Sequence, residues 1–423
     1  MIKLSTLCFS LALSLPCFAE NWPCFRGPSR QGISTEAGLP LKWSATEHVK
    51  WKSLVPGESW SSPIVWGERI FLTTAEDGGH SCRVLCFSAT DGKLLWNTEV
   101  FRQETGRKEA RNTYATPTPV TDGQRVYAVF GGGGFVAVDF EGKVAWTFRE
   151  FSYYSRHGLG ASPLLEDGLL VMPWDWSTDP EKEGIDKERY GWQLPWDRSF
   201  VFALDAASGK LAWKTSRGMS RIAHITPNLW TDETGRKQVV SGAGDVTQGY
   251  ALKTGELLWT GRNEGEAGSS AVVIAGGLVV QANGYNGYDS VRAYKLAGAK
   301  GDVTESGLAW EQKKNPPKIP SMVYIAPYIY CITEAGMAWC AEAETGELLY
   351  RERIEGTFAA SPIVSDGRIY ITAENGDTVV LPAAPKFEIL ARNPLGEDVQ
   401  ASPAVSGGRL FIRSKGSLFC IGN

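Results

Sequence analysis

A tryptophan-rich stretch is the part of this chain whose residue types point most directly to binding. The 28 residues from Met172 to Ser199 surround a charged centre with four tryptophans, Trp174, Trp176, Trp192 and Trp196. Tryptophan, tyrosine and arginine dominate recognition hot spots, so the stretch is a candidate binding loop. The alternative, compatible with the first, is that its rings pack as a small aromatic core that caps the central channel.

A second set of candidate binding residues lies on segments that connect repeated strands. It combines aromatic, cationic and imidazole side chains: Arg111, Tyr114, Tyr154, Arg156, His157, Arg221 and His224. Further polar and aromatic residues are expected beside them: Arg107, Asn112, Tyr153, Asp245, Asn283, Tyr285 and Tyr288. We expect all of these to share one face with the tryptophan-rich loop.

Other patterns that could carry chemistry do not meet its geometric requirements. The run Gly131–Gly134 precedes a strand-like segment, whereas a phosphate loop must open a helix. Cys82 and Cys86 would lie roughly 13 Å apart along a strand, too far for one metal ion beside His80. The sequence contains no hydrolase, zinc-protease or calcium-loop motif. We therefore expect no catalytic residue and no metal ligand.

The elements that position these residues follow from a phrase that occurs eight times. Each copy contains a small residue, usually with a proline beside it, and then a few apolar residues, a glycine and an apolar strand. The copies, 41 to 64 residues apart, are Ser62-Pro63, Thr118-Pro119, Ser162-Pro163, Thr226-Pro227, Ser270-Ala271, Pro320-Ser321, Ser361-Pro362 and Ser402-Pro403. Units of roughly 40–50 residues built from short strands are typical of propeller blades.

A second repeat runs in step with the first and ends each unit with an aromatic residue. A tight turn such as Asp91-Gly92 or Thr254-Gly255 leads into a strand that carries a tryptophan. We interpret these tryptophans as packing between blades: Trp51, Trp96, Trp146, Trp213, Trp259 and Trp310. The pattern predicts an all-β, eight-bladed β-propeller of four-stranded antiparallel blades.

The last two units are irregular, and one of them predicts how the ring closes. The seventh unit lacks the glycine-to-tryptophan signal but keeps its first two strands. The eighth stops one strand short at Asn423. We expect the strand around Trp51 to complete it beside Leu418 to Ile421, because closure removes an open sheet edge.

The start of the chain and its cysteines indicate an exported protein. Residues 1–19 have a lysine, an apolar stretch and a small residue before Glu20, as in a signal peptide, and we expect residues 20–423 to form one domain. Cys86, Cys340 and Cys420 occupy equivalent strand positions and are interpreted as small buried residues. Cys331 and Cys340 flank a turn, so a disulfide between them remains open.

Charge argues against nucleic-acid binding, and hydropathy argues against a transmembrane helix. The net charge is −4, which gives no basic footprint for nucleic acid. No segment after residue 19 is apolar enough for a transmembrane helix. We therefore expect a periplasmic or secreted protein, and no feature indicates an oligomer, so we expect a monomer.

The twin repeats resemble those of quinoprotein-dehydrogenase-like propellers, and most closely the exported proteins with PQQ-like repeats. The segments that carry this resemblance are 21–28, 60–67, 114–119 and 410–413. The resemblance covers nearly the whole chain after residue 19 and implies the fold. It leaves the activity open, because the superfamily contains both enzymes and scaffolds.

Three interpretations of function follow from this resemblance. We favour a non-catalytic scaffold, similar to the propeller lipoprotein of outer-membrane β-barrel assembly but without its anchor cysteine, that binds a protein or an envelope polymer without a cofactor. The second is an alcohol or sugar dehydrogenase that holds pyrroloquinoline quinone and Ca²⁺. The chain lacks the adjacent cysteines, the Cys-x-x-Cys-His haem site and the calcium ligands of such enzymes. The third is a carbohydrate-binding propeller.

Overall fold

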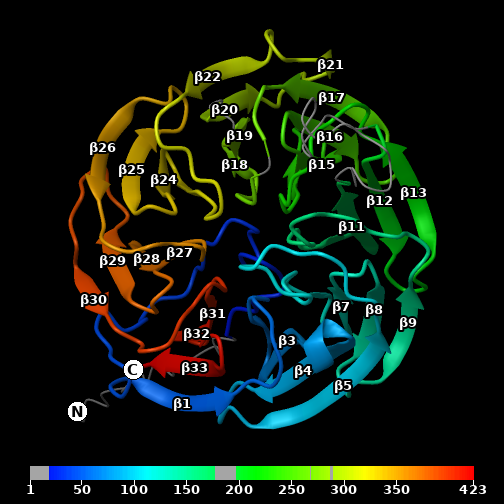
Figure 1. Ribbon diagram of the computed structural model, residues 1–423. Helices are drawn as coiled ribbons and strands as arrows, with labels where there is room; N and C mark the ends of the chain where they lie inside the picture. Colours follow the sequence, from blue (N-terminus) through cyan, green and yellow to red (C-terminus); the bar gives the residue numbers. More distant parts are fainter. Residues whose placement is uncertain (1–18, 177–196, 267, 286–288) are drawn as a thin grey trace, which may run out of the picture.

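The predicted eight-bladed propeller is confirmed. The computed structural model describes residues 19–176, 197–266, 268–285 and 289–423, in which eight antiparallel sheets are arranged as a closed ring (Figure 1). The predicted signal peptide falls almost entirely outside these residues, as do Trp192, Trp196 and Tyr288. None of the helices in the described part of the chain is long and apolar enough to cross a membrane.

In each blade the strands follow one another outward from the centre of the ring (Figure 1). Blade 1 contains β2 (Ile64–Trp66), β3 (Arg69–Glu76), the 3₁₀ turn η1 (Asp77–Gly79), β4 (Ser81–Ser88) and β5 (Leu94–Arg102). Blade 2 contains β6 (Val120–Thr121), β7 (Arg125–Val129), β8 (Phe135–Asp139) and β9 (Val144–Phe148). Blade 3 contains β10 (Leu164–Glu166), β11 (Leu169–Trp174), β12 (Phe200–Asp205) and β13 (Leu211–Ser216).

The next two blades are linked by an additional strand. Blade 4 contains β14 (Asn228–Thr231), β15 (Lys237–Gly242), β16 (Val246–Ala251) and β17 (Leu257–Arg262). Blade 5 contains β18 (Val273–Ala275), β19 (Leu278–Asn283), β20 (Ser290–Lys295) and β22 (Leu308–Gln312). Between β20 and β22, the short β21 (Gly301–Asp302) pairs in parallel with β17 and covers the outer edge of blade 4.

The last three blades include the two irregular units. Blade 6 contains β23 (Val323–Ile325), β24 (Tyr328–Ile332), β25 (Met337–Glu342) and β26 (Leu348–Arg353). Blade 7 contains β27 (Ile363–Ser365), β28 (Arg368–Thr372), β29 (Thr378–Pro382) and a short β30 (Ala391–Asn393). Blade 8 contains β31 (Ala404–Ser406), β32 (Arg409–Arg413), β33 (Ser417–Gly422) and β1 (Val49–Leu54).

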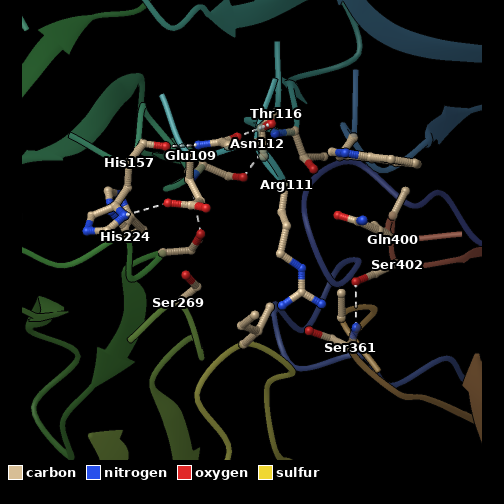
Figure 2. Close-up of a pocket in the computed structure, with 18 of the residues that line it drawn as sticks. Glu109, Arg111, Asn112, Thr116, His157, His224, Ser269, Ser361, Gln400 and Ser402 are labelled. Carbon is tan, nitrogen blue, oxygen red and sulfur yellow. Dashed lines mark hydrogen bonds and ion pairs between the residues drawn. The ribbon is translucent and has the colours of Figure 1, made fainter. Parts of the chain in front are cut away.

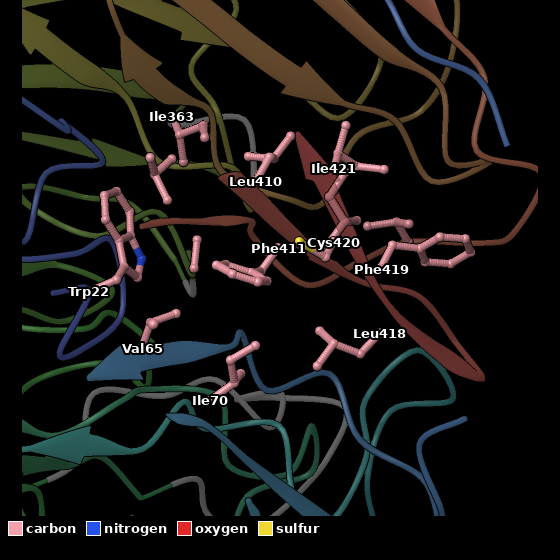
Figure 3. Close-up of a cluster of buried hydrophobic side chains, with 14 of the residues drawn as sticks. Trp22, Val65, Ile70, Ile363, Leu410, Phe411, Leu418, Phe419, Cys420 and Ile421 are labelled. Carbon is pink, nitrogen blue, oxygen red and sulfur yellow. The ribbon is translucent and has the colours of Figure 1, made fainter. Parts of the chain in front are cut away.

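The predicted closure is confirmed, because β1 pairs antiparallel with β33 and places Trp51 opposite Cys420. The side chains of β32 and β33 then form a core with Val65 and Ile70 of blade 1 and with Trp22 of the N-terminal segment (Figure 3). Both ends of the chain therefore contribute to one junction, and burial of this apolar surface holds the ring shut.

Five of the six predicted blade tryptophans link their blade to the next, whereas Trp259 donates its Nε1 to Gln238 Oε1 of its own blade at 3.0 Å. These five donate a hydrogen bond from Nε1 to a backbone carbonyl of the following blade, at 2.8–3.2 Å: Trp51, Trp96, Trp146, Trp213 and Trp310. Each ring also covers a turn glycine with positive φ: Gly92, Gly142, Gly209, Gly255 and Gly346. A side chain at the glycine would collide with the ring, so the turn and the tryptophan specify each other.

The cysteines are small residues within these junctions. The strand partners of Trp96, Tyr350 and Trp51 are Cys86, Cys340 and Cys420. Cys331 instead pairs with Trp339 and packs in the core between blades 5 and 6, whereas Cys340 packs in the core between blades 6 and 7. Cys331 and Cys340 therefore lie on opposite faces of their sheet, and all six cysteines of the described residues are unpaired.

A ring of hydroxyl groups surrounds the central channel where the innermost strands begin. In seven junctions a backbone N–H of one blade donates to a Ser or Thr hydroxyl of the next, at 2.9–3.0 Å; the acceptors are Ser62, Thr118, Ser162, Thr226, Ser321, Ser361 and Ser402. The sequence alignment of the fifth and sixth copies was wrong by one residue. Ala271, and not Ser270, takes the hydroxyl position of blade 5, so the ring is broken there.

The N-terminal segment crosses the centre of the ring (Figure 1). Trp22 forms a β-bridge with Val65 of blade 1, and Ile33 forms one with Val364 of blade 7. Arg30 pairs with Glu166 of blade 3 at 2.7 Å. These contacts fall on the ends of the innermost strands opposite to the hydroxyl ring, so the segment covers one end of the channel and leaves the other open.

Candidate functional site

The open end of the channel is a cavity of about 950 Å³. Its walls are the loops that connect one blade to the next, and six members of the hydroxyl ring form its base: Ser62, Thr118, Ser162, Thr226, Ser361 and Ser402. Phe25 of the N-terminal segment and Trp60 add aromatic surface. Pockets of this size suit a small ligand or the tip of a larger one.

The structure brings four of the predicted binding residues together around this cavity: Arg111, His157, Arg221 and His224. Figure 2 shows Arg111, His157 and His224 among them. Asn112 and Tyr285, also expected on this face, line it as well. Tyr154 and Arg156 lie on the loop that carries His157 and are half-buried, outside the lining. The Tyr114 hydroxyl donates to the Gly106 carbonyl at 2.5 Å, which braces the loop that carries Arg111.

The tryptophans of the insert occupy different positions. Trp174 ends β11 and is fully buried against Phe135, Tyr153 and Phe202. Its Nε1 donates to the Ser152 carbonyl at 2.9 Å. Trp176 is half-buried against the same core. Trp174 and Trp176 therefore belong to the core between blades 2 and 3 and not to an exposed rim, and most of the insert lies outside the described residues.

Two histidines form the most unusual part of the cavity wall. The rings of His157 and His224 meet edge-to-face with centroids 5.8 Å apart. Glu109 Oε2 lies 3.8 Å from His157 Nδ1, and the Asn112 side chain donates to the His157 carbonyl at 2.7 Å. Burial lowers the pKa of both histidines, and His157 lowers that of His224 further, to about 3. Both imidazoles are therefore neutral at neutral pH.

Arg221 and Glu266 bring opposite charges to the same wall. The Arg221 backbone N–H donates to Asp245 Oδ1 at 2.7 Å, and its Nη1 donates to the Glu264 carbonyl at 3.2 Å. Burial raises the pKa of Glu266, and the nearby Arg221 opposes that rise. Arg221 therefore offsets part of the cost of keeping Glu266 charged in this buried position.

Arg111 spans the mouth of the cavity. Its loop follows blade 1, yet its guanidinium pairs at 2.6 Å with Glu374, in the turn between β28 and β29 of blade 7. Figure 2 shows the side chain reaching across the cavity toward Ser361. Half of the Arg111 side chain is exposed, so this bridge is screened by solvent and adds little stability. It joins the loop after blade 1 to blade 7 across the opening.

Sequence reasoning missed several lining residues: Phe25, Trp60, Glu109, Glu266, Ser269 and Gln400. Most of them lie within five residues of a repeated phrase, on the segment that leads into it. Their position just before a phrase could have marked them as cavity residues. From the sequence alone the hydroxyl of the phrase looks like any small residue, because its hydrogen bond joins residues 40 to 64 positions apart in the chain.

A quinone cofactor that requires calcium would need a set of oxygen ligands for the ion. Ca²⁺ takes six to eight oxygen ligands, and within the described ranges no group of three or more His, Cys, Asp or Glu residues could hold a metal ion. The side-chain nitrogen of Asn112 donates to the His157 carbonyl, and its side-chain oxygen accepts from Thr113 and Thr116 of its own loop. We derive no reaction through such a cofactor.

Comparison with known proteins gives one family and a set of shared folds. A family profile described as "Outer membrane protein assembly factor BamB" matches residues 32–149, 197–331 and 307–385. None of the curated proteins matches the chain.

Two solved structures illustrate the range of proteins that share the fold. BamB from Moraxella catarrhalis is 13% identical with a TM-score of 0.60, over 88% of this chain and 98% of that one. The quinohemoprotein alcohol dehydrogenase ADHIIG from Pseudomonas putida HK5 is 13% identical with a TM-score of 0.61, over 95% of this chain and 80% of that one. At these identities the likeness establishes the fold alone.

Proposed function

The chain belongs to the family described as outer membrane protein assembly factor BamB, and on this premise we propose that it is a non-catalytic, exported binding propeller of the cell envelope. Its partner would be a protein or an envelope polymer, held by the face that carries the inter-blade loops. The family match supports an envelope location, and the signal-peptide pattern of residues 1–19 agrees with it.

The observation that carries this proposal is the asymmetry between the two ends of the channel. One end is crossed by the N-terminal segment, whereas the other is an open cavity with charged and aromatic walls. The walls are loops, but the hydroxyl ring and the blade tryptophans hold the strands beneath them in place. A rigid scaffold that presents variable loops is a common arrangement for recognition.

Site-specific photo-crosslinking in envelope preparations of the source cell tests the proposal. A photoreactive amino acid at Arg156, which is half-buried on the loop face, is expected to give a discrete crosslinked product. The same group at Lys50, exposed on the outermost strand of blade 8, is the matched control. Equal labelling from both positions, or none from either, would contradict an interaction through the loop face.

A titration separates the scaffold from the dehydrogenase alternative. Purified protein is mixed with pyrroloquinoline quinone and Ca²⁺, and dye-linked oxidation of ethanol and glucose is followed. We expect neither saturable quinone binding nor turnover, because the described ranges contain no group of three or more His, Cys, Asp or Glu residues that could hold a metal ion. Saturable binding accompanied by turnover would overturn the proposal.

A further inference from the structure

His224 is a buried polar side chain without the hydrogen bonds that burial normally requires. It is only 8% exposed, and neither Nδ1 nor Nε2 has a hydrogen-bond partner among the described residues. Buried polar groups in folded proteins are almost always paired, so an exception calls for an explanation. Here the ring lines the open cavity (Figure 2), so a ligand could supply the missing partners.

The protonation state of His224 restricts what that ligand can be. A neutral imidazole offers one donor and one acceptor. A hydroxyl group is also a donor and an acceptor, so it can satisfy either ring nitrogen. A carboxylate or phosphate only accepts, and an ammonium group only donates.

The other charges of the cavity are of both signs. Arg111 and Arg221 are opposed by Glu109 and Glu266, and Arg111 is already paired with Glu374. Arg221 keeps a buried Nε that has no partner in the described ranges. A wall that carries both signs of charge favours a neutral ligand that both donates and accepts, since a charged ligand would meet repulsion as well as attraction there.

The base of the cavity adds a ring of donors. Each of its six hydroxyls accepts a backbone N–H of the preceding blade through oxygen. That bond leaves the hydroxyl proton to be donated. Trp60 and Phe25 provide apolar faces between these donors. Aromatic faces among closely spaced donors and acceptors are complementary to a sugar ring, which has apolar C–H faces and polar hydroxyl edges.

We propose that this cavity binds a neutral sugar, with His224 and Arg221 as its central hydrogen-bonding residues. The inference extends the proposed binding function by naming a small-molecule site on the same face. A second arm of the test separates the two, because sugar binding is measured on purified protein and crosslinking at Arg156 on envelope preparations.

Ligand-observed NMR and calorimetry on the full-length protein provide the test. The neutral probes are glucose, N-acetylglucosamine and cellobiose, and the charged analogues are glucuronate and glucosamine. We expect saturable binding of at least one neutral probe and weaker binding of its charged analogues. No binding of any neutral probe, or tighter binding of glucuronate or glucosamine, would overturn the proposal.

Substitution of the histidine locates the site. His224→Phe keeps an aromatic ring and removes both nitrogens, so we expect about a tenfold or greater loss of affinity. Arg221→Met should cause a comparable loss and serves as the second variant if the first does not fold. His48→Asn, at an exposed histidine on blade 8, is the matched control and should bind as the parent does. Unchanged affinity in either His224→Phe or Arg221→Met would show that the sugar binds elsewhere.

Discussion

The junction of blades 3 and 4 and the histidine wall of the cavity treat buried polar groups in opposite ways. At this junction, the Trp213 Nε1 donates to the Leu252 carbonyl at 2.9 Å. In the cavity wall, His224 is equally buried but has no partner among the described residues. Satisfied polar groups stabilise a fold, and unsatisfied ones cost free energy. The Trp213 junction is thus satisfied within the protein, whereas the wall leaves hydrogen bonds that the proposed sugar would supply.

Removing a junction tryptophan should have the largest effect. Trp213→Ala deletes a buried ring and its hydrogen bond, so we expect a loss of about 3–5 kcal/mol in the free energy of unfolding, measured by urea denaturation. Trp213→Phe keeps most of the packing. Beyond the loss that its smaller buried surface explains, its free energy of unfolding should fall by only about 1 kcal/mol, because it lacks the Nε1 hydrogen bond. A loss below about 1 kcal/mol for Trp213→Ala would show that the junctions do not hold the ring together.

A pair of glycine variants tests the other half of the junction. Gly142 and Gly235 both end hairpin turns with φ near +85° and +82°. A Cβ on Gly142 would lie 2.8 Å from the Trp96 ring, whereas one on Gly235 meets nothing within 4 Å. Gly235→Ala should therefore cost about 1–2 kcal/mol for its left-handed backbone, and Gly142→Ala about 1–3 kcal/mol more. Equal costs from thermal or urea unfolding would remove the tryptophan contact from the explanation.

The stability that the histidine wall contributes should depend on pH and should fall as the pH is lowered. Burial and His157 lower the pKa of His224 from 6.5 to about 3, so the unfolded chain binds one more proton than the folded protein between those values. Stability conferred by neutral His224 is thus complete above about pH 6.5 and falls by about 1.4 kcal/mol per pH unit below it. His224→Phe removes this dependence and the unsatisfied nitrogens.

Urea denaturation of both proteins from pH 4.5 to pH 8 measures this difference. Above pH 7 the variant should be as stable as the parent or more so. At pH 5 the comparison should favour the variant by about 2 kcal/mol. Parallel stability curves would mean that His224 is hydrated or paired in solution, and would remove the main contrast between wall and junction.

The sequence contained the information for the junctions but only part of that for the wall. Trp51 and the repeated phrases predicted the blades and their closure, because each repeat encodes its own turn and its own packing residue. Arg221 and His224 were found because they precede a phrase. Glu266 was missed, since its role depends on an arginine 45 positions away in the chain. The burial of Trp174 was also hidden, because nothing in the insert marks where β11 ends.

The boundary between the two regions offers the smallest but most direct test. Ala271 interrupts the hydroxyl ring at blade 5, next to the segment that carries Ser269 into the cavity. Ala271→Ser should restore the eighth acceptor, opposite the Thr226 backbone N–H, and stabilise the protein by about 1 kcal/mol. Ser361→Ala, which opens the ring at a regular junction, is the matched control and should cost a similar amount. If Ala271→Ser stabilises the fold and also weakens sugar binding, the gap in the ring belongs to the cavity; if it stabilises without affecting binding, the gap is a neutral departure from the repeat.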